Sequence, residues 1–135
     1  MDEEKKKVLC VDDNINLCRT ISLVLGRKGF RADMARDGEE ALEKVERENY
    51  DIILLDIKLP GIDGVETLKR IRDVRKDANV IMMTAYAVED MVHEALEEGA
   101  KGVFYKPMDM DEVITGIEEN LECDLSPEDA REAFQ

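Results

Sequence analysis

Short apolar runs along this chain alternate with longer stretches in which apolar residues recur every three or four positions. The short runs predict buried strands, and the longer pattern predicts amphipathic helices. We expect strands at Val8–Val11, Phe30–Met34, Ile52–Leu55, Asn79–Met83 and Gly102–Tyr105. We expect helices over about residues 15–28, from 37, from 63, over about 89–98, and from 109 to about 121.

Polar residues at the helix starts support this division. An acidic N-cap residue followed three positions later by Glu forms a capping box, which marks the beginning of a helix. Three such pairs are present: Asp37 with Glu40, Asp63 with Glu66, and Asp109 with Glu112. The helix over about 89–98 lacks this signal, and we therefore expect a mobile surface around it.

Regular alternation of strands and helices predicts an α/β fold, a doubly wound five-stranded parallel sheet of the flavodoxin-like kind with helices on both faces. The run Ile52–Leu55 is apolar throughout, as in a central strand buried on both faces. In Phe30–Met34 apolar and polar residues alternate, which indicates an edge strand and favours the strand order 2-1-3-4-5. We assign residues 1–122 to this domain and residues 123–135 to a C-terminal extension or the start of a linker.

Composition narrows the classes of function. The 135 residues are 44% hydrophobic, enough for a folded core, and their formal net charge of −14 argues against nucleic acids and anionic membranes as partners. No segment has the roughly 20 apolar residues of a membrane span, and the charged start lacks a signal-peptide core. These features predict a cytoplasmic protein.

A few residues with chemical potential have simple interpretations. Cys10 and Cys18 lie in apolar patterns and are expected in the core, and the odd number of cysteines, without metal-ligand spacing, indicates reduced thiols. The lone His93 is expected on a helix surface. The short basic run Lys5–Lys7 is expected to be a solvated entrance to the first strand.

The residues that follow the predicted strands carry the chemistry. In a parallel sheet all strands end at the same edge, so Asp12, Asp13, Asp56, Thr84 and Lys106 should meet there. Carboxylates about 4 Å apart repel by roughly 4 kcal/mol per pair at an effective dielectric constant near 20. A divalent cation would offset this repulsion, and oxygen ligands suit Mg²⁺.

Each of these residues also has a plain structural explanation. Asp12 and Asp13 suit a helix cap, Asp56 suits a turn, Thr84 suits a strand, and Lys106 suits a strand end. Their joint placement at one edge is much less probable by chance, and it favours a functional site.

Four motifs then give a resemblance. They are Val11-Asp12-Asp13-Asn14, Leu55 to Gly64, Met83-Thr84-Ala85 and Lys106-Pro107, and they span about residues 6–122. In this order they are highly specific, and the chain resembles a response-regulator receiver domain of two-component phosphorelay signalling.

The resemblance implies a role for each site residue. Asp56 would be the phosphoacceptor, Lys106 would pair with a phosphoryl oxygen, and Thr84 would hydrogen-bond another. Asp13 would bind Mg²⁺ directly, and Asp12 would assist through hydrogen bonds or water. Asp56 itself and the backbone carbonyl of Lys58 would complete the protein ligands. The Lys106–Pro107 peptide bond is expected to be cis.

As a whole, the resemblance implies a switch that catalyses only its own phosphorylation and dephosphorylation. Its partners would be a sensor histidine kinase or phosphotransferase and a downstream output domain or target protein, and activation would favour a homodimer. The alternative is a Mg²⁺-dependent phosphatase with an aspartyl nucleophile, but its second catalytic acid would fall at Lys58. A flavin-binding module would need a phosphate loop where Asp12-Asp13-Asn14 would repel phosphate.

One position departs from the family pattern. Receivers commonly carry an aromatic residue or His three positions before the Lys, and this chain has Val103 there. The phosphorylation chemistry should survive, but the usual aromatic readout is in doubt. Lys58 and Tyr86 flank the expected site and are expected to tune hydrolysis and access.

Overall fold

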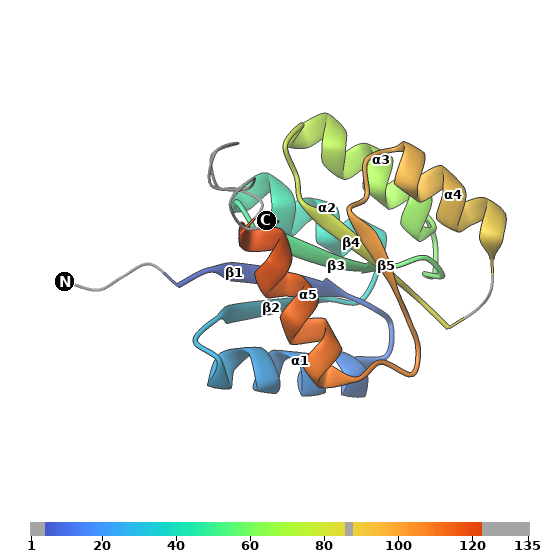
Figure 1. The fold of residues 1–135 in the computed structure, drawn as a ribbon. Coiled ribbons are helices and arrows are strands. Elements are labelled where there is room, and N and C mark those ends of the chain that lie inside the picture. Colours follow the sequence, from blue (N-terminus) through green and yellow to red (C-terminus); the bar gives the residue numbers. More distant parts are fainter. Residues whose placement is uncertain (1–4, 86–87, 123–135) are drawn as a thin grey trace, which may run out of the picture.

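The computed structural model describes residues 5–85 and 88–122, and they form a five-stranded sheet covered by helices (Figure 1). All strands pair in parallel, in the order β2-β1-β3-β4-β5. The predicted fold class and strand order are therefore confirmed. The strands are β1 (Lys7–Val11), β2 (Arg31–Ala35), β3 (Ile52–Asp56), β4 (Val80–Thr84) and β5 (Gly102–Tyr105).

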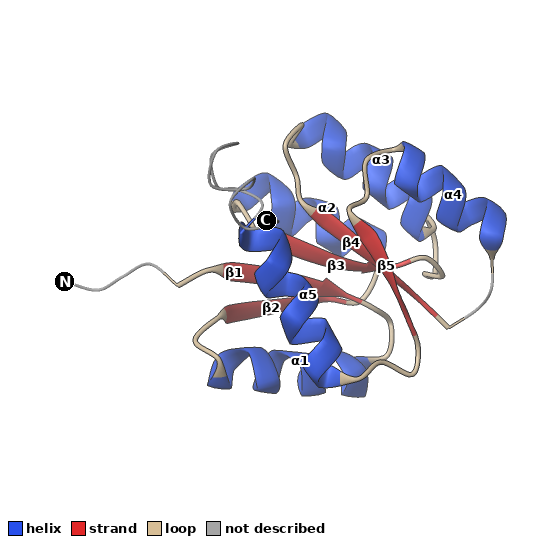
Figure 2. Ribbon diagram, in the orientation of Figure 1, coloured by secondary structure: helices blue, strands red, loops and turns tan. Residues whose placement is uncertain are grey.

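Helices cover both faces of the sheet (Figure 2). One face packs against α1 and α5, and the other packs against α2, α3 and α4. No helix in the described part of the chain is long and apolar enough to cross a membrane. The helices are α1 (Ile15–Arg27), α2 (Gly38–Arg47), α3 (Gly64–Val74), α4 (Glu89–Glu97) and α5 (Met110–Glu122).

The central strand β3 is buried along its whole length, as its apolar run predicts. Its side chains alternate between the two cores, since Ile53 and Leu55 pack with α2 and α3 whereas Ile52 and Leu54 pack with α1 and α5. Burial on both faces fixes the position of β3 within the sheet. Its last residue, Asp56, therefore lies at the edge where the strands end.

The predicted helix starts are confirmed, but the capping boxes are only half formed. Asp37 and Asp63 accept the N–H of the third residue of their helices, as predicted. The return bond is absent in both cases: Glu40 accepts the N–H of Arg36, and Glu66 pairs with Arg70. In α5, the Asp109 carboxylate accepts the N–H of Asp111 and not that of Glu112. The weak start of α4 is confirmed, because its N-cap, Val88, makes no side-chain cap.

Several smaller expectations can also be compared with the structure. Gly29 follows α1 with a φ of +93°, a conformation that suits glycine and ends the helix. The second strand begins at Arg31, one residue later than predicted. The Lys106–Pro107 bond is cis as expected. Tyr86 and the proposed extension at 123–135, with Cys123, lie outside the described residues.

Candidate functional site

The carboxyl ends of the strands bring the five predicted site residues to one edge of the sheet. Asp12 and Asp13 follow β1, Asp56 ends β3, Thr84 ends β4, and Lys106 follows β5. The Lys106 N–H donates to the carbonyl of Thr84 over 2.8 Å, which ties the ends of β4 and β5 together. The edge predicted from the sequence is thus assembled by the parallel topology alone.

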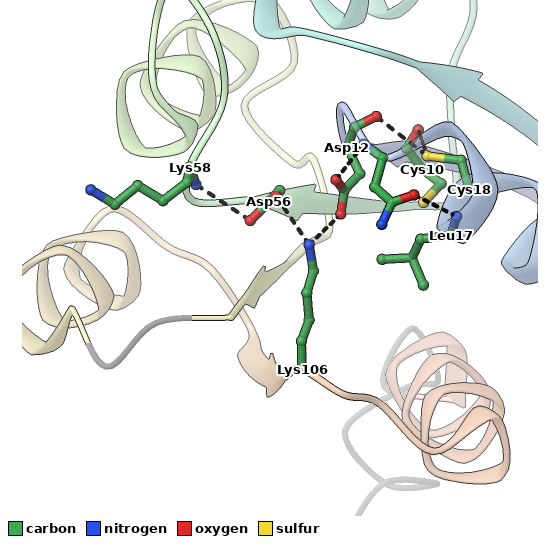
Figure 3. Close-up of polar contacts among 8 residues, drawn as sticks. Cys10, Asp12, Leu17, Cys18, Asp56, Lys58 and Lys106 are labelled. Carbon is green, nitrogen blue, oxygen red and sulfur yellow. Dashed lines mark hydrogen bonds and ion pairs between the residues drawn. The ribbon is translucent and has the colours of Figure 1, made fainter.

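Lys106 connects two of the carboxylates (Figure 3). Its Nζ atom lies 2.5 Å from Asp12 Oδ2 and 3.1 Å from Asp56 Oδ2. The side chains are largely removed from solvent, with 18% of Lys106, 1% of Asp12 and 6% of Asp56 exposed. Such burial is tolerated because the charges are paired and hydrogen-bonded.

The second oxygen of each buried carboxylate accepts a hydrogen bond from the main chain. Asp12 Oδ1 accepts the N–H of Asn14 over 2.9 Å, and Asp56 Oδ1 accepts the N–H of Lys58 over 3.3 Å. The Lys58 side chain extends away from Asp56 and is exposed (Figure 3). At this position the chain therefore offers Asp56 a backbone amide and no second carboxylic acid, which disfavours the phosphatase alternative.

The electrostatics of the site are unbalanced. Burial raises the pKa of Asp56, and the charge of Asp12 raises it further, against the opposing effect of Lys106. Burial alone would lower the pKa of Lys106, but its hydrogen bonds to Asp12 and Asp56 outweigh this effect and raise it. One ammonium group thus serves two buried carboxylates, and a negative charge remains uncompensated.

Three carboxylates are placed to hold a cation. Asp12, Asp13 and Asp56 each offer one oxygen, and these oxygens lie within 4.8 Å of one another. Two oxygens on opposite sides of a Mg²⁺ ion would be about 4.2 Å apart, because Mg–O distances are about 2.1 Å. The residues therefore fit a hard divalent cation with small adjustments. Within the described ranges, no other group of three His, Cys, Asp or Glu residues has this arrangement.

Thr84 and Val103 lie on the neighbouring strands β4 and β5. Thr84 is fully buried at the end of β4. Val103 is half-buried and packs on the core that includes α3 and α4, whereas Phe104 packs on the opposite core, as strand alternation predicts. Phe104 therefore does not replace the aromatic residue that is missing at Val103.

Gly64 is a positioning residue whose role is not evident from the motif in which it lies. A Cβ atom at Gly64 would lie 2.1 Å from the carbonyl oxygen of Asp56 and 2.6 Å from Cα of Ile57. The Gly64 N–H donates to the carbonyl of Ile57 over 2.7 Å. Only glycine allows α3 to start this close to Asp56. In the sequence, the only sign of this role is the spacing of Pro60 and Gly64 after Asp56. The spacing does not show which backbone atoms come into contact.

The expectation that Cys10 and Cys18 are core residues is confirmed, since both are buried. The Cys18 thiol also donates to the main-chain carbonyl of Asp12 over 3.5 Å. This contact joins α1 to the segment that carries Asp12 (Figure 3), and the apolar pattern did not predict it.

Comparisons with known proteins identify relatives of this chain. The family model described as "Response regulator receiver domain" matches residues 8–118. Sporulation initiation phosphotransferase F of Bacillus subtilis (strain 168) is 39% identical over 116 residues, covering 86% of this chain and 94% of that protein. Transcriptional regulatory protein ZraR of Klebsiella oxytoca is 38% identical over 121 residues, or 90% of this chain. The chain spans only 27% of the length of ZraR.

Solved structures show the same fold. A response regulator receiver domain protein (CheY-like) from Methanospirillum hungatei JF-1 matches with a TM-score of 0.86 and 29% identity, covering 96% of this chain and 99% of that one. The CheX–CheY–BeF3–Mg²⁺ complex from Borrelia burgdorferi matches with a TM-score of 0.78 and 35% identity, covering 87% of each chain.

Proposed function

Because this chain belongs to the response regulator receiver domain family, we propose that the Asp56 carboxylate is the phosphoryl acceptor of its signalling switch. The chain is a phosphoacceptor module of two-component signalling, and its reaction modifies its own side chain. The observation that carries the proposal is the position of Asp56, which has Lys106 on one oxygen, a backbone amide on the other, and Asp12 and Asp13 beside it.

The surroundings of the three carboxylates support a different role for each. Asp12 is fully buried and makes the shorter contact with Lys106, at 2.5 Å, which suits a fixed supporting group. Asp13 is exposed and free to meet an incoming cation. Asp56 makes the longer contact with Lys106, at 3.1 Å, and is therefore the easier of the two to release for reaction.

In the proposed reaction, an Asp56 oxygen attacks the phosphorus of a phosphohistidine in line with the P–N bond. The P–N bond breaks, its electron pair returns to the imidazole nitrogen, which takes up a proton, and an aspartyl phosphate remains. Lys106 then exchanges its Asp56 contact for a phosphoryl oxygen while keeping Asp12. A Mg²⁺ ion held by Asp13, Asp56 and the Lys58 carbonyl, with Asp12 assisting through hydrogen bonds or water, would neutralise phosphoryl charge.

We propose that Thr84 responds to phosphorylation of Asp56. Its hydroxyl would donate to a second phosphoryl oxygen, because β4 pairs directly with β3 and Thr84 ends at the same edge. The aliphatic Val103 offers no hydrogen-bonding ring that could follow Thr84 inward. The response should instead involve the start of α4, which has no side-chain cap at Val88.

We propose that the phosphoryl donor is a phosphohistidine of a sensor histidine kinase or phosphotransferase. The signal would pass to a downstream output domain or target protein, and these steps would take place in the cytoplasm. Two relatives support this proposal, since one is named a phosphotransferase and the other is a CheY bound to CheX. In this assignment residues 1–122 are the receiver domain and 123–135 an extension or linker start.

Incubation with acetyl phosphate and Mg²⁺, read out by intact-protein mass, tests the acceptor. The wild type should gain one phosphoryl group, Asp56→Asn should gain none, and the exposed control Asp73→Asn should behave as wild type. Chelation of Mg²⁺ should suppress the reaction in the wild type and in Asp73→Asn. Equal modification of Asp56→Asn and wild type would overturn the assignment of Asp56.

A further inference from the structure

The edge of the sheet opposite Asp56 carries a basic cavity that phosphorylation does not use. Parallel strands begin at one edge of the sheet and end at the other (Figure 1). The cavity is lined by Lys7 and Arg31, the first residues of β1 and β2. Its volume is about 780 Å³, within the range of about 300–1,000 Å³ that is typical of small-molecule sites. Its charged lining residues are Lys5, Lys7, Arg31, Arg47, Glu48 and Asp51.

The two carboxylates of this basic cavity are already engaged by its own cations. Glu48 Oε1 lies 3.5 Å from Lys7 Nζ and 3.4 Å from Arg31 Nη2. Asp51 Oδ2 accepts the main-chain N–H of Lys7 over 2.7 Å. These contacts leave the carboxylates little capacity to attract a further cation, and they hold Lys7 and Arg31 in place.

Positive charge remains after this pairing. Lys5 and Arg47 are exposed and have no ion-pair partner among the described residues. Lys6 lies beside the cavity, 4.0 Å from Asp51. The whole chain carries a net charge of −14, so an anion would be repelled from most of its surface and attracted here.

The position of Glu48 is itself fixed from the core side. The Tyr50 hydroxyl lies 3.2 Å from Glu48 Oε2 and 2.7 Å from Asp33 Oδ2, and it connects both carboxylates. Tyr50 packs against the core on the face of α2 and α3. A cation held by Glu48 is therefore connected to a partly buried aromatic residue that packs on the core, and such preorganisation reduces the entropy lost when an anion binds.

We propose that this basic cavity binds a small polyanion of the phosphate class, one that carries at least two negative charges. Guanidinium groups such as those of Arg31 and Arg47 match phosphate oxygens in pairs, and Lys5 and Lys7 add point charges. The sequence alone predicts that the Lys5–Lys7 run is a solvated strand entrance. Only the folded chain brings Arg31 and Arg47 to the same cavity as Lys5 and Lys7. The proposal does not depend on phosphorylation of Asp56.

Titration of the full chain with inorganic pyrophosphate tests the proposal, at constant ionic strength and without Mg²⁺, followed by ¹H–¹⁵N NMR. We expect saturable shifts of the amides of Lys7, Arg31 and Asp51. The double variant Lys5→Gln/Arg47→Gln should bind at least tenfold more weakly, since the loss of a single charge-assisted hydrogen bond already costs about that factor. These two side chains have no ion-pair partners in the described chain, so the fold should be unaffected, as urea unfolding would verify.

The matched control is Arg19→Gln/Lys101→Gln, which removes the same two charges at exposed positions outside the cavity. Its affinity for pyrophosphate should equal that of the wild type. Equal weakening in both double variants, shifts that do not saturate, or shifts confined to Asp12 and Lys106 would overturn the proposal. Tighter binding of a hexaglutamate peptide than of pyrophosphate would overturn the assignment to a small ligand.

Discussion

The ammonium group of Lys106 lies 3.1 Å from the carboxylate of Asp56, a residue fifty positions earlier in the chain. The same group lies 2.5 Å from Asp12, so one cation is shared by two buried carboxylates. Both oxygens of each carboxylate are hydrogen-bonded, yet the charges do not cancel. This surplus of negative charge is the electrostatic reason to expect a cation at the site.

Replacement of Lys106 by Met should destabilise the domain and slow its phosphorylation. The variant leaves Asp12 and Asp56 buried without their cation, and breaking a buried pair costs about 3–5 kcal/mol. Urea unfolding at neutral pH without Mg²⁺ measures the change. The control Lys69→Met removes an exposed ion pair with Glu94 and should cost less than about 1 kcal/mol. Equal losses in the two variants would show that Lys106 does not neutralise the site.

Replacement of Asp56 by Asn should stabilise the metal-free domain, and more so at higher pH. Burial and the Asp12 charge raise the pKa of Asp56 in the folded state. The protonated Asp56 side chain therefore stabilises the folded state. This contribution is complete below the pKa of Asp56 in the unfolded chain, about 3.9, and it is lost as pH rises through the pKa of Asp56 in the folded state. Asn does not ionise and avoids this loss.

The gain from Asp56→Asn should be on the order of 1 kcal/mol at pH 7 and should shrink as pH falls toward 4.5. Urea unfolding in a chelating buffer across this range measures it. The exposed control Asp73→Asn should stay within about 0.5 kcal/mol of wild type at every pH. A gain that does not vary with pH would indicate a packing effect and not relief of charge.

The elements and the acidic edge were predictable because each depends on a local pattern plus one topological rule. The apolar run Ile52–Leu55 identifies a strand buried on both faces, and the alternation in Phe30–Met34 identifies an edge strand. Once the sheet is parallel, Asp12, Asp56 and Lys106 must share an edge. No knowledge of side-chain packing is needed for these steps.

Contacts between distant segments were not predictable in this way. Three such features depend on how the helices pack on the sheet. They are the different distances from Lys106 to Asp12 and Asp56, the approach of Gly64 to the Asp56 carbonyl, and the placement of Arg31 and Arg47 in one cavity. The missing return bonds of Glu40 and Glu66 show the same limit at short range. Glu40 bonds to the main chain of Arg36 and Glu66 to the side chain of Arg70, and the capping-box spacing does not account for these competing partners.

Replacement of Gly64 by Ala should destabilise the domain by about 1–3 kcal/mol, the usual cost of overpacking. The added methyl group would meet the main chain of Asp56 and Ile57, which no side-chain rotation can relieve. Thermal or urea unfolding measures the loss. The control Gly26→Ala adds its methyl group where no atom lies within 4 Å, and in a helix it should stabilise by about 0.5–1 kcal/mol. Equal effects of the two substitutions would contradict the packing of α3 on Asp56.

Mg²⁺ should stabilise the folded domain through the three carboxylates, and Asp13 is the residue best suited to prove it. Asp13 is exposed and outside the Lys106 network, so Asp13→Asn removes a ligand without disturbing the buried pair. At a Mg²⁺ concentration ten times the dissociation constant, the wild type should gain about 1.4 kcal/mol in its free energy of unfolding. Asp13→Asn should need a several-fold higher concentration for the same gain, whereas Asp73→Asn should respond as wild type. Urea unfolding at a series of Mg²⁺ concentrations, with Ca²⁺ as a second ion, measures both. An identical response of Asp13→Asn and wild type would mean that the cluster binds its cation without Asp13, or that the ion acts elsewhere on this acidic chain.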